Sequence, residues 1–453
     1  MGKPPGCWYF GGKNMSPRGR GAPQREVVSV AKSFAQAPTP ESSRMVLTRP
    51  TLASSAAEGF SSVRIGDSTR VSLMLTPHGR GGLREQIEEL LTAQHRILGR
   101  QDYPMSVTSQ TVFLRNPEDL DACRQILSRH YESAWPATTI VFQAPCCGAA
   151  LALEAWAVGG PNTHVKHFGA NTLSVDFDGN RWIYCTGIRS PQTGEGVYQQ
   201  ARILLDKMRA SLTEAGTGFQ QVIRTWFYLG SITENEKNGS QRYKELNRAR
   251  ADFYQDVAFQ CSLAHPNIPQ GIYPASTGIG MHGKDLLGSC IALETRRTDG
   301  MLLPLENPQQ TPAYAYHPRF SPKSPKFSRG MALVLGNYIT TWVSGTASVV
   351  HSNSLHPGDI TKQTHQTIDN IQRLISAENF GFHGVSQGGC ALTDLAKIRV
   401  YLKRPEDFST CKAICDERFG TIPVIYAVAD VCRPELLVEI EGVAFSRRGS
   451  AAS

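Results

Sequence analysis

Three segments of the chain repeat one order of predicted elements, and this repetition constrains the fold more than any other feature of the sequence. Each segment reads as an amphipathic helix, a strand, a second helix, a proline step and a last strand that ends in glutamate. Repetition at this length indicates one supersecondary unit used three times. The first helices are predicted over residues 83–98, 197–215 and 360–374, the following strands over 106–114, 222–229 and 397–402, and the last strands over 151–154, 291–294 and 438–441.

Comparison of the three predicted last strands separates shared residues from a residue found once. The alignment puts Glu154, Glu294 and Glu441 at one position, whereas Glu439 aligns with alanine in both other copies. Glu439 and Glu441 are two residues apart on a strand, so their side chains point to the same face. Two neighbouring carboxylates repel each other and raise the pKa of at least one of them. The sequence therefore predicts that Glu439 can act as a proton donor.

The pattern of the third copy indicates a sheet with helices on one face. In the strand over residues 397–402, Ile398, Val400 and Leu402 alternate with polar and aromatic residues, as expected for a strand with one face on helices. The other face needs a partner, which two more units can supply. We therefore predict an α+β fold of three similar units, each a mixed sheet with two helices on one face, arranged as an intramolecular pseudo-trimer. The predicted segments are a disordered leader (1–60), a first unit (61–160), a second unit (165–300), a proline-rich linker (301–325), a catalytic third unit (326–446) and a disordered tail (447–453).

The net charge of +8 does not predict a nucleic-acid partner. Before Gly59, eight basic residues face only three acidic ones, so most of the excess lies in the leader and the rest of the chain is only mildly basic. The leader is rich in Ser, Pro, Gly, Ala and Arg, a composition typical of disorder. It is interpreted either as a transit peptide or as an extension before a true start near Met45.

The apolar residues and the cysteines exclude further classes. No apolar run approaches the ~18 residues that span a bilayer, so no membrane partner is predicted and a cytoplasmic protein is expected. The 11 cysteines form no CxxC pair, and Cys411 and Cys415 have no second half-site of ligands, so buried thiols are favoured over a metal site. No metal or organic cofactor is predicted.

Short motifs in the third copy resemble the Rid/YjgF family, in a resemblance that covers all three copies and is specific in the second and third. They are SGTAS at residues 344–348, HPGD at 356–359 and LVEIEG at 437–442. The resemblance implies trimers with active sites at subunit interfaces and, in general, hydrolysis of reactive enamines and imines. That activity depends on an arginine two residues after the proline of the penultimate strand. The matching positions here are Thr138, Ser276 and Ile425, so imine deamination is disfavoured.

The third copy with its preceding linker is more similar to the chorismatases, a Rid-like branch. The similar stretches are YAYHPR at 314–319, SPKFSR at 324–329 and VCRPELLVE at 431–439. The resemblance implies cleavage of the enolpyruvyl ether of chorismate with release of pyruvate, and it makes Glu439 the acid that protonates the ether. Gly345 and Cys432 resemble the branch that yields 3-hydroxybenzoate rather than a dihydroxycyclohexadiene carboxylate. Chorismatases resemble two Rid units, whereas this chain has three.

A dianionic substrate requires cationic contacts, preferably guanidinium groups that bind carboxylates in bidentate fashion. Simpler interpretations remain open: an ion pair of Arg399 with Glu441, a surface position for the linker residues and for Arg329, and packing for Cys432. The predicted substrate-binding residues are Arg329, Arg399, Arg319, Tyr316 and Tyr401.

Three functions remain open at this point. The first is a chorismatase-like lyase or hydrolase acting on a small carboxylate. The second is a Rid-type enzyme acting on another reactive enamine, imine or enol, and the third is a non-catalytic protein that binds a small carboxylate. A monomer with an internal pseudo-trimer is expected in each case.

Overall fold

The computed structural model describes residues 45–48, 59–79, 81–192, 194–259, 263, 272–317 and 323–449. All of them belong to one compact unit, Glu41–Ser453. Most of the predicted leader, the predicted tail from residue 450 and the candidate Arg319 therefore lie outside the described residues. One part of the predicted leader is ordered, because β1 (Val46–Thr48) pairs antiparallel with β2 (Gly59–Ile65).

Three six-stranded sheets in the described part of the chain share one strand order. The order is β1-β2-β3-β6-β4-β5 in the first sheet, β7-β8-β9-β12-β10-β11 in the second and β13-β14-β15-β20-β18-β19 in the third. In each sheet the last two strands in this order run parallel, as β4–β5, β10–β11 and β18–β19. The remaining bounds are β3 Ser68–Leu75, β4 Ser106–Leu114, β5 Ala137–Phe142, β6 Leu151–Gly159, β7 His164–Phe168, β8 Thr172–Phe177, β9 Asn180–Arg189, β10 Val222–Gly230, β11 Ala275–Met281, β12 Leu286–Thr295, β13 Gly300–Leu305, β14 Gly330–Leu335, β15 Tyr338–Ala347, β18 Leu395–Leu402, β19 Val424–Val428 and β20 Val438–Arg447, with β16 Val349–Val350 and β17 Asn353–Ser354 as a separate pair.

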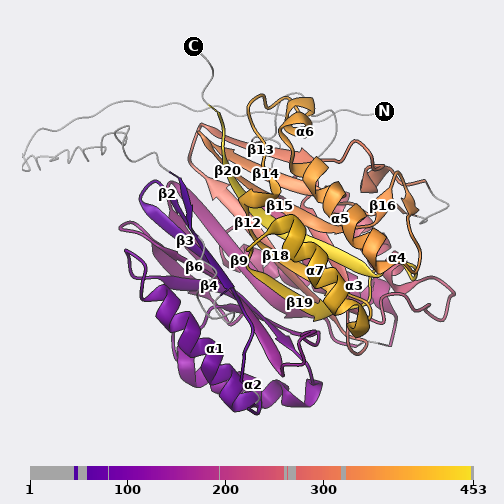
Figure 1. The fold of residues 1–453 in the computed structure, drawn as a ribbon, viewed down its shortest axis with the longest axis horizontal. Helices are drawn as coiled ribbons and strands as arrows, with labels where there is room; N and C mark the ends of the chain where they lie inside the picture. Colours follow the sequence, from indigo (N-terminus) through magenta and orange to yellow (C-terminus); the bar gives the residue numbers. More distant parts are fainter. Residues whose placement is uncertain are drawn as a thin grey trace, which may run out of the picture. The chain divides into compact units, whose positions relative to one another are not determined.

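Helices connect the strands in the same places in each unit. Two helices in the third unit lie side by side over one face of its sheet (Figure 1), where Ile368 and Ile371 pack with Val400 and Ile440 in one apolar cluster. This confirms the expected helix-facing side of the strand over residues 397–402. Among the described residues, no helix is both long enough and apolar enough to cross a membrane. The helices are α1 Leu83–Leu98, α2 Leu120–Tyr131, α3 Val197–Glu214, α4 Arg242–Tyr254, α5 Ile360–Ile375, α6 Ala377–Phe382 and α7 Phe408–Phe419.

The opposite faces of the three sheets pack against one another. Strand β5 contacts β9, β11 contacts β15, and β19 contacts β3. The edge strand that pairs in parallel in each sheet therefore lies against a strand of another unit. Phe113, Tyr228 and Tyr401, one from each sheet, are buried together in a cluster between them. The face of each sheet that carries no helices is thereby covered by the other units.

The predicted linker begins too early. Residues 300–305 form β13, which pairs antiparallel with β14 and opens the third sheet. Pro304 suggested a linker because proline has no backbone N–H to donate within a sheet. Strand β13 lies at the edge of its sheet, and an edge strand tolerates proline because its outer side makes no hydrogen bonds to another strand.

The strand register corrects one alignment of the three copies. The pairing of β6 with β4, of β12 with β10 and of β20 with β18 defines one equivalent position in the three sheets. In β6 this position is Glu154, opposite Thr111. In β12 it is Ser289, opposite Trp226, and in β20 it is Glu441, opposite Arg399. Glu294, which the sequence placed there, lies further along β12 and pairs with Arg181 at 3.4 Å, where both side chains are partly exposed. The near-identity of the segments at 151–154 and 291–294 misled the alignment, because pairing register and not local similarity sets the position.

Contacts between the sheets agree with this register. The hydroxyl groups of Ser289 and Thr139 are 2.9 Å apart, and Thr277, from the matching strand of the second unit, donates to Glu441. In this register the counterparts of Glu439 are Ala152 and Leu287. Glu439 therefore remains the carboxylate that occurs in one copy alone.

Candidate active site

Two glutamates of β20 point from the third sheet towards the second. Their neighbours Val438 and Ile440 face the helices of the third unit, so Glu439 and Glu441 lie on the opposite face, as the alternation of a strand requires. Both are almost fully buried, at 4% and 3% exposed. The expectation that the two carboxylates share one face is therefore confirmed.

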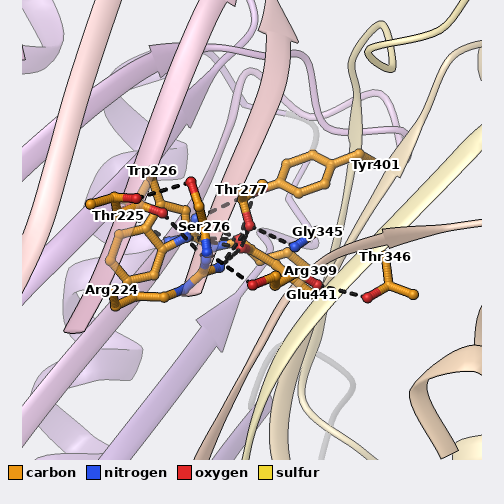
Figure 2. Close-up of polar contacts among 12 residues, drawn as sticks. Arg224, Thr225, Trp226, Ser276, Thr277, Gly345, Thr346, Arg399, Tyr401 and Glu441 are labelled. Carbon is orange, nitrogen blue, oxygen red and sulfur yellow. Dashed lines mark hydrogen bonds and ion pairs between the residues drawn. The ribbon is translucent and has the colours of Figure 1, made fainter. Parts of the chain in front are cut away.

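Glu441 lies in a network of donors from two sheets (Figure 2). Trp226 Nε1, Arg399 Nη1 and Tyr401 Oη each donate to it at 2.9 Å. Arg224 and Thr277 of the second unit also donate to Glu441. Burial alone would raise its pKa, but Arg399 and Arg224 hold the pKa below the ordinary value. Glu441 is therefore ionised at neutral pH.

Glu439 has the opposite electrostatic environment. Burial raises its pKa, the negative charge of Glu441 raises it further, and Arg224 only partly opposes them, so that the pKa is about 8. A carboxylic acid beside an ionised carboxylate is thus held protonated near neutrality. This direction agrees with the prediction from the pair of glutamates.

Glu439 opens onto a cavity between the second and third units. The walls come from α4 and β11 on one side, from β15 and β20 on the other, and from the segments before β14 and before β20. The residues that line it are Tyr243, Arg250, Ser276, Gly278, Gln310, Tyr316, Pro325, Phe327, Arg329, Gly345, Ala347, Val349, Cys432, Arg433, Leu436 and Glu439.

Three arginines give this cavity a positive wall. Arg250 is 2% exposed, its Nε is buried without a partner, and no carboxylate among the described residues pairs with it. It donates instead to the Ser276 hydroxyl at 3.1 Å and to Asn247 Oδ1 at 2.6 Å. The helix α4 thereby places a guanidinium group beside Ser276.

The other two arginines lie around Tyr316. Arg329 donates to the Tyr316 hydroxyl at 2.8 Å, and its Nε lies 3.8 Å from Glu306 Oε2. The guanidinium of Arg433 is 5.8 Å from the centre of the Tyr316 ring and donates to the carbonyl of Ser352 at 2.9 Å. An anionic ligand in this cavity would therefore meet charge-assisted donors on more than one side.

Gly345 and Cys432 shape the surroundings of Glu439. A Cβ atom at residue 345 would run into the Glu439 carboxylate, so glycine leaves the room that this side chain occupies. Burial, with a smaller contribution from Glu439, raises the pKa of the Cys432 thiol to about 12. Cys432 is therefore a neutral thiol in the cavity wall and not a thiolate nucleophile.

The structure brings together five of the predicted site residues and places two elsewhere. Glu439, Cys432, Gly345, Arg329 and Tyr316 line the cavity. The other two, Arg399 and Tyr401, do not reach it, because both donate to Glu441 and Arg399 also donates to Glu154 of the first unit. Arg399 forms the ion pair with Glu441 that the simpler interpretation described.

Sequence reasoning missed Arg250 and Tyr243, the two cavity residues on α4. Tyr243, Asn247 and Arg250 follow one another at i, i+4 and i+7, which puts three polar side chains on one helix face. All three point inward. A polar stripe on a helix that must also bury Leu246 and Phe253 is the signal that could have identified them.

Two family models and several curated proteins match this chain. Residues 154–292 match the family model described as chorismatase FkbO/Hyg5-like, N-terminal, and residues 323–446 match the endoribonuclease L-PSP model. The chain is 35% identical over 298 residues to a 3-hydroxybenzoate synthase of Streptomyces hygroscopicus, an alignment that covers 64% of this chain and 80% of the relative. It is 32% identical over 301 residues to a chorismatase of Streptomyces rapamycinicus, which covers 64% of this chain and 81% of the relative.

One solved structure aligns with much of the chain. A crystal structure of a chorismatase matches with a TM-score of 0.56 at 23% identity, and the match covers 75% of this chain and 93% of that one. At this level of identity the likeness shows a shared fold.

Proposed function

The chain belongs to the chorismatase family, and we propose that it cleaves the enolpyruvyl ether of chorismate to release pyruvate and a hydroxybenzoate. The observation that carries this proposal is Glu439, a buried acid with a pKa of about 8 that opens onto an arginine-lined cavity. Cleavage of a vinyl ether begins with proton transfer to carbon, which a carboxylic acid that stays protonated at neutral pH can supply.

Binding of chorismate, a dianion, is assigned to the arginines of the cavity. We assign one carboxylate to Arg250, which has no anionic partner among the described residues, and the other to the pair Arg329 and Arg433. Guanidinium groups bind carboxylates in bidentate fashion and so fix orientation as well as charge. The substrate is thereby held with its ether group towards Glu439.

The reaction starts when Glu439 delivers its proton to the methylene carbon of the enolpyruvyl group. The ether carbon then carries a positive charge, which the Glu439 carboxylate, ionised by the transfer, stabilises from the cavity wall. Breaking the bond between the ether oxygen and the ring carbon releases pyruvate, and the neighbouring ring hydroxyl closes an epoxide onto that carbon as its proton returns to Glu439. The epoxide then opens at the carbon that first carried the hydroxyl. Loss of the ring proton from the other epoxide carbon leaves an aromatic ring with its hydroxyl group meta to the carboxylate. Pyruvate and 3-hydroxybenzoate together contain the atoms of chorismate, whereas pyruvate and a dihydroxycyclohexadiene carboxylate require one added water.

The product we propose is 3-hydroxybenzoate, because Gly345 and Cys432 match the branch of the family that forms it. Incubation with chorismate and chromatographic separation of the ring product tests this directly. A peak that co-elutes with 3-hydroxybenzoate is expected, and one that co-elutes with 4-hydroxybenzoate would overturn the assignment of the product. A dihydroxycyclohexadiene carboxylate would overturn the assignment of the product while leaving ether cleavage in place, and unconverted chorismate would overturn the proposed function.

We further infer that the three units form an intramolecular pseudo-trimer. Support comes from the shared strand order of the three sheets and from the cyclic contacts of β5 with β9, β11 with β15 and β19 with β3. In such an arrangement the cavity at Glu439 corresponds to a subunit interface of a Rid trimer, and the other two interfaces lack the acid.

The rate of pyruvate release is expected to fall as the pH rises through about 8. The folded-state pKa of Glu439 is raised to about 8, so the acid stays protonated below that pH and is lost above it. The value of kcat/KM should therefore fall tenfold per pH unit on the basic side, since it reports the free enzyme. Initial rates measured from about pH 6 to about pH 10 check this, and a profile that stays flat across the range would contradict it.

The Glu441→Gln variant provides the matched comparison. Removing the charge of Glu441 removes one of the causes that raise the pKa of Glu439, so the basic limb should move to lower pH. If the rate falls over the same basic pH range in both proteins, a group other than Glu439 controls the pH dependence.

The Gly345→Ala variant is expected to lower kcat by roughly 10-fold to 100-fold, because a displaced catalytic group costs about that much. The added methyl group would collide with the Glu439 carboxylate and force it away from its position. Gly381→Ala is the control, since a Cβ atom at residue 381 meets no atom within 4 Å. Initial rates and thermal denaturation of both variants check this, and equal rates would show that Glu439 can move without loss.

A further inference from the structure

A second cavity lies where all three sheets meet, away from Glu439. Its lining includes Arg70 and Trp156 of the first unit, Trp182 and Tyr184 of the second, and Trp342 and Phe445 of the third. None of its lining residues also lines the cavity at Glu439. The mechanism proposed above makes no use of it.

Arg70 is the charged group of this second cavity. Arg70 is 9% exposed, and its Nε is buried without an acceptor. No hydrogen bond or ion pair joins the Arg70 side chain to any residue in the described ranges. The guanidinium carbon lies 5.0 Å from the centre of the Phe177 ring and 5.7 Å from that of Trp182. Burying a charge without a hydrogen-bonded partner is costly, so this arrangement favours binding of an acceptor.

The nearest carboxylate does not supply that acceptor. The charge of Asp178 partly opposes the lowering of the Arg70 pKa that burial causes, but Asp178 Oδ2 accepts its hydrogen bond from the Ser68 hydroxyl, at 2.6 Å. Trp182 Nε1 is a second buried donor without a partner in the same wall. Two donors therefore lack acceptors in a cavity whose other walls are largely aromatic.

We propose that this second cavity binds a small aromatic carboxylate, with the carboxylate on Arg70 and the ring between Trp156, Trp182 and Trp342. A carboxylate provides two acceptor oxygens for a guanidinium group, and indole rings pack well against a planar ring. The ligand class is that of the ring product of the proposed reaction, but binding at Arg70 does not depend on turnover. The site would let an aromatic acid act on the protein from outside the catalytic cavity.

Titration with benzoate and with 3-hydroxybenzoate tests this site, read by tryptophan fluorescence and by calorimetry. Three tryptophans line the second cavity, whereas none lines the cavity at Glu439, so fluorescence reports the second one. Saturable quenching by both acids is expected, and much weaker quenching by benzamide, which lacks the charge. Arg70→Met should weaken benzoate binding by about 10-fold or more, as expected for a lost charged hydrogen bond.

Two further variants separate this site from the catalytic one and from misfolding. Arg250→Met removes a cation of the catalytic cavity and should leave the fluorescence titration unchanged. Val443→Phe keeps Arg70 but fills the second cavity, in which Val443 is a wall residue, and should also abolish quenching. Absence of saturable quenching in the wild type would overturn the proposal. So would unchanged affinity in a folded Arg70→Met protein or, if that variant does not fold, in Val443→Phe.

Discussion

Replacing Glu439 with glutamine is expected to lower kcat for pyruvate release by about 10²-fold to 10⁴-fold, the range that a general acid contributes. Glutamine has nearly the same shape but no acidic proton. Burial and the charge of Glu441 keep Glu439 protonated near neutrality, so the variant removes the proton and leaves the arginines of the cavity in place. A coupled pyruvate assay gives kcat and KM, and calorimetry with a non-cleavable substrate analogue gives the affinity.

The matched control is Glu435→Gln. Glu435 is exposed and accepts a hydrogen bond from the Ser354 hydroxyl at 2.6 Å, and it lies outside the lining of the cavity. The rate of pyruvate release by the Glu435→Gln variant should stay close to that of the wild type. An unchanged rate in Glu439→Gln would remove Glu439 from the chemistry, and a loss that appears in affinity and not in kcat would make it a binding residue.

Replacing Glu154 with glutamine is expected to lower the free energy of unfolding by about 3–5 kcal/mol, the cost of breaking a buried ion pair. Glu154 of the first unit accepts from both Lys397 and Arg399 of the third, and all three side chains are less than 10% exposed. The variant removes the negative charge that Lys397 and Arg399 both contact, and these two side chains stay buried. Urea denaturation of the wild type and the variant measures the difference.

Glu294→Gln is the control that also tests the strand register. Its side chain is 34% exposed and pairs with Arg181, so its loss should cost about 1 kcal/mol or less. Equal losses in the two variants would contradict the placement of Glu154, and not Glu294, in the network between the units.

The acid sensitivity of folding should change with Glu154 as well. Burial alone would raise the pKa of Glu154, but Arg399 and Lys397 lower it from 4.5 to about 2. A lowered folded-state pKa stabilises the protein above the unfolded value, and that contribution disappears as the pH falls from about 4.5 to about 2. The Glu154→Gln variant should lack this part of the pH dependence of stability.

Local pattern predicted the elements of the fold well where a single physical rule decides them. The repeated order of elements predicted α1 at residues 83–98 as observed, and the alternation in residues 397–402 predicted which face of that strand packs on helices. The position of Glu294 was wrong because two strands with similar sequences differ in pairing register. Register depends on the whole sheet, which a short alignment does not contain.

The site was predictable only in part for a related reason. Glu439 could be identified because a carboxylate that occurs in one copy alone stands out against the other two. For Arg399, strand alternation predicted the correct face, but which neighbour covers that face depends on the first unit, whose Glu154 reaches it. Arg250 lies on a helix of a different unit from Glu439, and no short-range pattern in the sequence joins the two.

The central claim is that this chain converts chorismate by cleaving its enolpyruvyl ether, and the stoichiometry of that conversion tests it most directly. Chorismate consumed and pyruvate formed are measured in the same reaction with purified wild-type protein. One pyruvate per chorismate is predicted. Consumption of chorismate without pyruvate, or no consumption at all, would contradict the claim.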